Sequence, residues 1–186
     1  MNVPIDVHPD SDEALVARIV RGEVRAFEPL YERYERRLFG FLVTRVSSRA
    51  DAEELFHEAF MRTVDSGASF DHDGAFRTYL FRTARNLALN LRRSERRGLH
   101  AVESLPPESA PRTAEENLVE ERMRHALHGA VERLPPQLAE VFHLRTSGLQ
   151  YEEMASVLEI PLGTLKSRMN QMVNRLREEL RQWTVP

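Results

Sequence analysis

The chain has 186 residues, of which 41% are hydrophobic and 30% charged, and its formal net charge is −3. This length and apolar content suffice for one domain or for two small ones with compact cores. The absence of cysteine excludes disulfides and thiolate chemistry and is compatible with a reducing compartment. No apolar run reaches the length of a membrane span, and residues 1–13 lack the pattern of a signal peptide. We therefore expect a cytoplasmic protein with no membrane insertion of its own.

Charge is distributed unevenly along the chain. Residues 76–100 hold seven Arg against one Glu, and residues 101–121 hold six Glu against one Arg. From residue 162 onward there are five Lys or Arg against two Glu. Two basic segments separated by an acidic one predict two surfaces that contact a polyanion, with a distinct linker between them.

Helical spacing of apolar residues begins after a short N-terminal tail. Asp10 with Glu13 predicts the start of a first helix, and Gly22 predicts its end. A longer helix follows, with Pro29 near its start. Its apolar residues recur every three or four positions and predict a stripe that faces the core. They are Phe27, Leu30, Tyr31, Tyr34, Leu38, Phe41, Leu42 and Val46.

A third helix is predicted after an N-terminal cap at Ser48 to Asp51. Its buried face comprises Ala52, Leu55, Phe56, Ala59, Phe60 and Thr63. Asp51, Glu54 and Glu58 line another face at positions i, i+3 and i+7. Carboxylates can serve acid–base chemistry or metal binding, but only His57 is nearby and no second cluster has ligand spacing. A solvated acidic stripe is the common interpretation, and a docking face for a basic partner is the more specific one.

The fourth helix is predicted from about Ala75 to Arg97, after a loop of small and polar residues at 66–74. Its core positions are Phe76, Leu80, Ala84, Leu87 and Leu91. Polar residues cover the rest of its surface: Arg77, Arg82, Arg85, Asn86, Asn90, Arg92 and Arg93. Interleaved Phe76, Tyr79 and Phe81 could stack on bases while arginines hold phosphates, as on surfaces that bind melted DNA. Alternatively the aromatics are core and the arginines only solubilise; we assign Phe76 to the core and leave Tyr79 open.

Residues 98–114 contain three prolines and predict an extended linker. Helical spacing returns from Glu115, with Leu118, Met123, Leu127, Val131 and Leu134 apolar. Pro135-Pro136 starts a further helix, which Gly148 closes. No stretch alternates with period two. The fold class expected is therefore all-α, with two small helical domains.

Tyr151 to Arg168 has the pattern of two short helices joined by a tight corner. Met154, Ala155 and Leu158 share one face of the first, and Pro161 suits the first turn of the second. The buried stripe of the second helix comprises Leu165, Met169, Met172 and Leu176. Its outward residues, suited to a DNA major groove, are Thr164, Lys166, Ser167, Arg168 and Gln171. An ordinary helical hairpin with a solvated face would give the same local pattern.

Four stretches in this order resemble the extracytoplasmic-function (ECF) sigma factors, the minimal two-domain sigma subunits of bacterial RNA polymerase. They are Asp51 to Phe60, Phe76 to Arg93, Leu134 to Val141, and Ile160 to Arg168. The resemblance covers residues 12–97, as sigma region 2, and residues 115–182, as sigma region 4. It implies a tail over residues 1–11 and a linker over 98–114 that passes through the polymerase cleft.

The resemblance also implies roles for individual residues. Docking on the clamp helices of the largest polymerase subunit, beta-prime, falls to Asp51, Glu54 and Glu58. Recognition of the melted minus-ten element, with one base flipped out, falls to Ser69, Phe70, Arg77, Tyr79, Arg82, Arg85, Asn86, Asn90 and Arg93. We expect Asn86 to read a base edge and the arginines to hold phosphates chiefly. Recognition of the minus-thirty-five element falls to Thr164, Lys166, Ser167, Arg168 and Gln171.

Several positions depart from the family pattern. Gln150 stands where a serine cap is usual, and we expect it to be a poor cap that costs about 1 kcal/mol. Glu159 stands where glycine is usual at the corner of the helix-turn-helix. Asn170 and Gln171 replace basic or aromatic residues, which bears on minus-thirty-five preference.

The sequence thus predicts a factor that binds core RNA polymerase, including its beta and beta-prime subunits, and recognises promoter DNA. We expect no catalytic residue, cofactor or metal, because the polymerase performs the chemistry, and we expect an anti-sigma factor as a partner. Two alternatives remain: a sigma-like decoy that only binds an anti-sigma factor, and a stand-alone helix-turn-helix regulator. The arginines at 77–93 argue against the decoy, and the acidic helix at 51–60 argues against the regulator.

Overall fold

The structure is a computed structural model that describes residues 11–66, 70, 74–97 and 117–181, except the side chains at 96, 97 and 117–121. The elements are α1 (Asp12–Val20), the 3-10 turn η1 (Val24–Ala26), α2 (Phe27–Val43), α3 (Arg49–Asp65), α4 (Ala75–Arg97), α5 (Asn117–Glu132), α6 (Pro136–Thr146), α7 (Tyr151–Leu158) and α8 (Leu162–Glu179). Within these ranges every regular element is helical, so the all-α prediction is confirmed. None of the described helices is long and apolar enough to cross a membrane.

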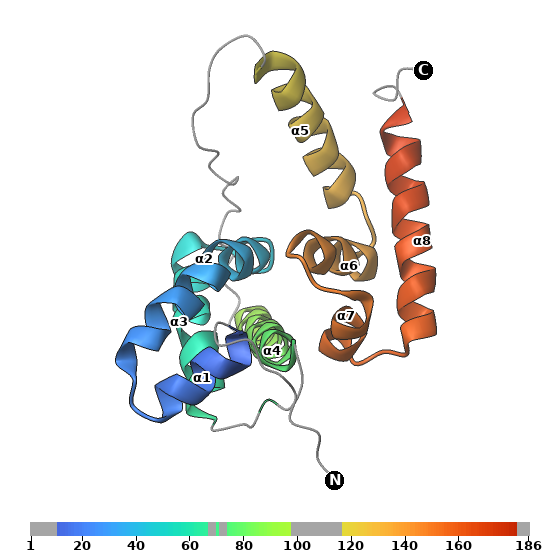
Figure 1. The fold of residues 1–186 in the computed structure, drawn as a ribbon. Helices are drawn as coiled ribbons and strands as arrows, with labels where there is room; N and C mark the ends of the chain where they lie inside the picture. The colour runs from blue at the N-terminus through green and yellow to red at the C-terminus, as the bar shows by residue number, and fades with distance from the viewer. Residues whose placement is uncertain (1–10, 67–69, 71–73, 98–116, 182–186) are drawn as a thin grey trace.

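The first domain is a bundle of α1 to α4 around an aromatic core (Figure 1). Tyr34, Phe41, Phe60, Phe76 and Phe81 are fully buried. Their rings meet edge to face, with centroids 5.4 Å apart for Phe41 and Phe81 and 6.1 Å apart for Phe60 and Phe76. Phe76 is therefore a core residue, as predicted, and so is Phe81, which excludes the alternative that these two rings stack on DNA bases. Phe76 packs on Tyr34 of α2 and Phe60 of α3, and Phe81 packs on Phe41 of α2.

The start of α1 differs from the prediction. Asp10 lies outside the described residues, and Ser11 is the N-cap, with its hydroxyl accepting a hydrogen bond from Ala14 N at 3.1 Å. Glu13 does not reach back along α1. Its side chain is buried, and its Oε1 accepts a hydrogen bond from Phe76 N at 3.2 Å. Glu13 therefore satisfies a free N–H in the first turn of α4, 63 residues away in sequence.

The second domain packs α6, α7 and α8 together, with α5 lying against α6 and α8. Its buried residues include Leu138, Val141, Leu144, Met154 and Leu165. Most predicted apolar positions of α6 to α8 are thus core residues, whereas Leu176 of the predicted α8 stripe is half-buried. On α5, however, Met123 is 52% exposed, so this apolar position of the predicted helix is not a core residue.

The two domains touch, which the sequence pattern did not predict. α4 of the first domain lies against α7 of the second, and both are joined into one cluster of buried residues. Figure 1 shows α4 below α6 and beside α7. The contact brings an arginine-rich helix next to the acidic side chains of α6 and α7.

Candidate polymerase and nucleic-acid interfaces

The acidic face of α3 carries the three predicted docking carboxylates in different settings. Glu54 is exposed. Glu58 Oε1 lies 2.5 Å from Arg62 Nη2 one turn later. Asp51 belongs to the helix cap. Its Oδ2 accepts a hydrogen bond from Ser48 Oγ at 2.6 Å, and its backbone N–H donates to Ser48 Oγ at 3.0 Å. Glu54 and Glu58 are therefore the carboxylates that this face presents outward.

Two neighbours of these carboxylates were not among the predicted docking residues. His57 Nε2 lies 3.2 Å from the Tyr31 hydroxyl, and His57 Nδ1 lies 2.8 Å from the Glu53 carbonyl oxygen. Met61, one turn beyond Glu58, is 48% exposed. The signal for Met61 is present in the sequence, because it is an apolar residue three positions after Glu58 on the otherwise polar face of the helix. The outward face of α3 therefore combines negative charge with an apolar contact.

The predicted minus-ten residues of α4 divide into those on its outward side and two arginines, Arg77 and Arg85, that contact the second domain. Asn86, Asn90 and Arg93 are exposed at positions i, i+4 and i+7, and so form one outward row. Tyr79, left open by the sequence, is half-buried, and the Arg82 guanidinium lies 5.5 Å from its ring centre. This outward row, with Tyr79 and Arg82, is here called the α4 polar face.

The loop before α4 is described at Phe70, while Ser69 lies outside the described residues. The Phe70 ring packs edge to face on Phe76 and Tyr79, with centroids 5.5 and 5.9 Å apart. Phe70 is half-buried. It therefore connects the core to Tyr79 at the edge of the α4 polar face.

Arg77 and Arg85 do not lie on a free surface, so the prediction that they spread over the exposed side of α4 is wrong. Arg77 Nη2 lies 2.8 Å from Glu153 Oε1 of α7. Arg85 Nε lies 2.8 Å from Glu140 Oε1 of α6. Burial lowers the pKa of Arg77, but Glu153, Tyr34 and Asp12 raise it, and the net direction is upward. Both arginines are therefore paired with carboxylates of the second domain.

Arg45 and His143 add two half-buried basic groups to the contact between the domains. Burial lowers the pKa of Arg45 to about 10, although Glu140 opposes the shift. Burial, with a smaller effect of Arg45, lowers the pKa of His143 to about 4. A shallow pocket of about 300 Å³ beside them is lined by residues of α2 and α6, including Arg36, Arg37 and His143. His143 is therefore neutral at physiological pH.

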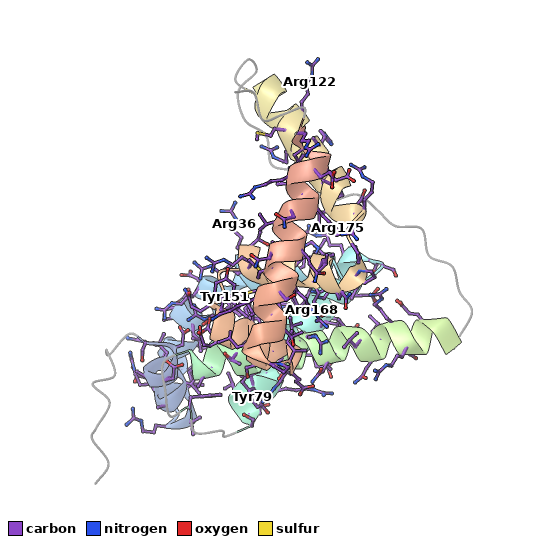
Figure 2. All side chains as sticks on the ribbon, turned by 90° about the vertical axis from the view of Figure 1, so that its right-hand side faces the viewer. Arg36, Tyr79, Arg122, Tyr151, Arg168 and Arg175 are labelled. Atoms are coloured by element: carbon purple, nitrogen blue, oxygen red, sulfur yellow. The ribbon has the colours of Figure 1, made fainter. Side chains whose placement is uncertain are left out.

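The predicted minus-thirty-five residues lie on the outward side of α8. Thr164, Lys166, Ser167 and Gln171 are exposed and Arg168 is half-exposed, while Leu165, Met169 and Met172 are buried. Gln171 Nε2 donates to Ser167 Oγ at 3.3 Å. Figure 2 shows Arg168 and Arg175 along α8, two turns apart. Arg175 is exposed and was not among the predicted residues, because it lies beyond the short helix-turn-helix pattern.

The two unusual positions of the helix-turn-helix have clear geometries. Glu159 has φ 56° and ψ 43°, the left-handed conformation that glycine adopts at lower cost. At the start of α7, Gln150 N donates to Glu153 Oε2 at 2.7 Å. The start of α7 is capped even though Gln150 was predicted to be a poor cap, because Glu153 supplies a capping bond to the residue before the helix. Pro161 precedes the first turn of α8, which begins at Leu162.

No group of three or more His, Cys, Asp or Glu side chains could hold a metal ion among the residues that the structure describes. What the site offers is two polar helix faces with cationic and amide side chains, on α4 and α8, and an acidic face on α3. These are the features of a two-domain, all-helical DNA-binding protein.

Comparisons with known proteins agree with this class. Residues 30–98 match the family model of sigma-70 region 2, and residues 124–181 match that of sigma-70 region 4. The ECF RNA polymerase sigma-E factor of Escherichia coli K12 is 34% identical over 170 residues, covering 86% of this chain and 88% of that protein. The RNA polymerase sigma-H factor of Pseudomonas aeruginosa is 30% identical over 178 residues, covering 86% of this chain and 89% of that protein. The chain belongs to the ECF sigma factors of the sigma-70 family.

Solved structures show the same fold. CnrH in complex with the cytosolic domain of CnrY aligns with a TM-score of 0.65 at 22% identity, covering 92% of this chain and 97% of that one. The sigma factor RpoE of Bartonella quintana, in complex with the anti-sigma factor NepR, aligns with a TM-score of 0.63 at 23% identity, covering 83% of this chain and 96% of that one.

Proposed function

We propose that this sigma factor docks on core RNA polymerase through the outward face of α3 and places two DNA-reading helices on a promoter. The α4 polar face reads the melted minus-ten strand, and the first half of α8 reads the minus-thirty-five duplex. The protein contributes recognition and strand separation in the cytoplasm, and the polymerase performs the chemistry. The domain limits that accompany these roles are 12–97 and 115–182, with a linker at 98–114.

The observation that carries this proposal is the alternation on α8. Leu165 and Met169 are buried against the second domain, while Lys166 and Ser167 between them are exposed. An α-helix that presents hydrogen-bonding and cationic side chains from its first turns suits the width and the donor–acceptor pattern of a major groove. The exposed amides of α4 then supply base-edge contacts to the second promoter element.

Docking on polymerase is supported by charge and exposure together. Glu54 is exposed and Glu58 is accessible on the same face of α3. Both carboxylates are complementary to basic helices such as the clamp of the beta-prime subunit. Met61 adds the apolar contact that a stable protein interface contains at its centre.

Control by an anti-sigma factor is proposed from the partners of the two structural relatives. Both were solved with a second protein bound, and in the Bartonella quintana complex that protein is the anti-sigma factor NepR. Such a partner would act by covering the faces on α3, α4 or α8 assigned above. Binding of the full chain to core polymerase in the presence and absence of the partner measures this directly.

Run-off transcription with reconstituted polymerase tests the whole proposal. Core enzyme with the full chain is incubated with a DNA library in which both promoter elements are randomised, and transcribed templates are sequenced. Enrichment of two short motifs at a fixed spacing supports the assignment. Binding of duplex DNA by the isolated chain, with no transcription from any template, would support a stand-alone regulator instead.

A further inference from the structure

The contact between the two domains includes two ion pairs that use arginines of α4. Arg77 Nε donates to Glu153 Oε1 at 2.9 Å, and its Nη2 lies 2.8 Å from the same oxygen. Arg85 Nε donates to Glu140 Oε1 at 2.8 Å. The four side chains are between 12% and 21% exposed, so water screens these pairs only weakly. These two pairs are here called the clasp.

Glu153 also sits at the N-terminus of α4. Gly74 has φ +80°, and a Cβ built on it would overlap the Glu153 carboxylate. Thr78 N donates to Gly74 O at 3.0 Å, so Gly74 is the residue before the first turn of α4. A carboxylate in this place interacts favourably with the positive end of the helix dipole. A phosphate group would satisfy the same N-terminus and the same guanidinium.

The ion pair between Arg85 and Glu140 has a third member, Arg45. Glu140 Oε1 is shared, because Arg45 Nη2 lies 3.8 Å from it while Arg85 holds it at 2.8 Å. Within the described part of the chain, Arg45 Nε and Nη2 are buried and have no hydrogen-bond partner. The Arg45 guanidinium lies 4.1 Å from the centre of the Phe41 ring, which offsets part of its desolvation. A buried cation with unused donors weakens the closed arrangement, and solvent reaches those donors once the domains separate.

We propose that Glu140 and Glu153 occupy the positions of DNA phosphates on Arg85 and Arg77, so that the second domain closes over α4 and limits nucleic-acid binding by the free chain. The clasp leaves the exposed row at Asn86, Asn90 and Arg93 uncovered. It therefore removes the phosphate contacts of Arg77 and Arg85, which contribute to affinity for any sequence, and leaves the base-reading amides accessible. Opening requires a polyanion or a partner that competes for the two arginines. The limit on nucleic-acid binding rests on the proposed minus-ten role of α4. The closure of the two domains does not, because it is a property of the free chain.

Distance measurement between the domains tests the closure. Because the chain has no cysteine, spin labels can be placed at Glu35→Cys on α2 and Arg177→Cys on α8, both exposed positions. In this parent we expect one narrow distance distribution by pulsed electron resonance. Glu140→Gln with Glu153→Gln removes both charges and retains one acceptor oxygen at each position, and we expect a broad, longer component. Each lost pair should raise the open-to-closed ratio about tenfold.

The matched control is Glu152→Gln with Glu178→Gln. Both residues are exposed in the second domain, and the pair changes the net charge by the same amount. The control should keep the distribution of the parent. If the double clasp variant melts without a cooperative transition, the two single variants give the measurement, each with an intermediate open fraction. A folded clasp variant with the distribution of the parent overturns the proposal.

Fluorescence anisotropy with a labelled single-stranded oligonucleotide of mixed sequence tests the consequence. The clasp variant should bind at least about fivefold more tightly than the control variant, because two cationic contacts become available. Equal affinities of the two variants would contradict the phosphate-mimic role. Run-off transcription separates this proposal from the sigma assignment. If the clasp variant shows the open distance component but never supports transcription, the sigma assignment is contradicted. If it supports transcription but keeps the distance distribution of the parent, the clasp is contradicted.

Discussion

Glu159 holds the corner between α7 and α8 in a conformation that costs energy for any residue with a side chain. Its φ of 56° lies in the left-handed region, and its N–H donates to Ser156 O at 3.2 Å. Glycine adopts this conformation without the clash of a Cβ.

We therefore expect Glu159→Gly to stabilise the fold. The relief of backbone strain exceeds the added entropy of the unfolded chain, and the net gain should be about 0.5–1 kcal/mol in urea unfolding. Glu152→Gly, in the first turn of α7, is the matched control and should cost a similar amount. A loss of stability in both variants would contradict the strain argument.

Glu13 is the second residue whose role is local and energetic. Its buried carboxylate accepts the Phe76 N–H at the start of α4, as described above. Glu13→Ala leaves this buried donor without a partner and should cost about 2 kcal/mol in urea unfolding. Glu13→Gln retains an acceptor oxygen and should cost less. If Ala and Gln cost the same, the hydrogen bond to Phe76 is not the source of the effect.

At the scale of elements, α3 and α4 each present an outward face on a helix whose opposite side is core. On α4 the exposed Asn86 and the half-buried Arg82 belong to the same polar face. Their side chains have different chemistry, since an amide pairs with a base edge and a guanidinium chiefly with phosphate. Arg85 also belongs to the clasp, so Arg82 is the clearer representative of the phosphate contacts.

Asn86→Ala and Arg82→Ala should therefore change promoter recognition in different ways. Loss of a base contact should cost about 1–3 kcal/mol at one promoter position and change the ranking of single-base variants. Loss of a phosphate contact should weaken all variants alike and reduce the salt slope by about one. Transcription on a promoter panel measures both. A uniform decrease for Asn86→Ala, together with a lower melting temperature, would instead indicate a structural role.

On α3 the prediction concerns docking. Glu54→Lys with Glu58→Lys should weaken association with core polymerase at low salt while the fold is retained, because the outward face then repels a basic partner. Glu32→Lys with Glu35→Lys on α2, exposed residues with the same change of charge, is the control and should bind like the parent. Equal binding of both double variants in a pull-down titration would remove α3 from the interface.

At the scale of the whole molecule, the contact between domains places His143 in a buried, cationic setting. Burial, then Arg45, lowers the pKa of His143 to about 4. The unfolded chain has an ordinary histidine pKa of about 6.5, so below this pH the unfolded state binds the additional proton. Stability that is present above pH 6.5 is thus lost progressively as the pH falls toward 4.

His143→Gln should flatten this part of the pH profile. The difference in stability between the parent and the variant should shrink by about 1–3 kcal/mol between pH 7 and pH 4.5. Carboxylates also titrate in this window, but they are common to both proteins and cancel in the difference. Urea unfolding at several pH values measures it, and parallel profiles would show that His143 is accessible to protons in the folded state.

Much of this protein could be predicted locally. The bounds of α4, Ala75–Arg97, follow from apolar spacing alone, and Ser48 was identifiable as the cap of α3. The core positions of α2, α3 and α8 follow from the same period, because one face of an amphipathic helix must be buried. The outward residues of α8, from Thr164 to Gln171, follow as the complement of that buried stripe.

What the sequence determined by itself is therefore the set of helices, their buried faces and the family to which they belong. What only the tertiary structure decided is which distant groups meet: Glu13 with the start of α4, Glu153 with Arg77, and Glu140 with Arg85. Helical period assigns a charged residue to the polar side of its own helix. It carries no information on whether another domain covers that side, because such pairings depend on how the bundles pack and not on spacing along the chain.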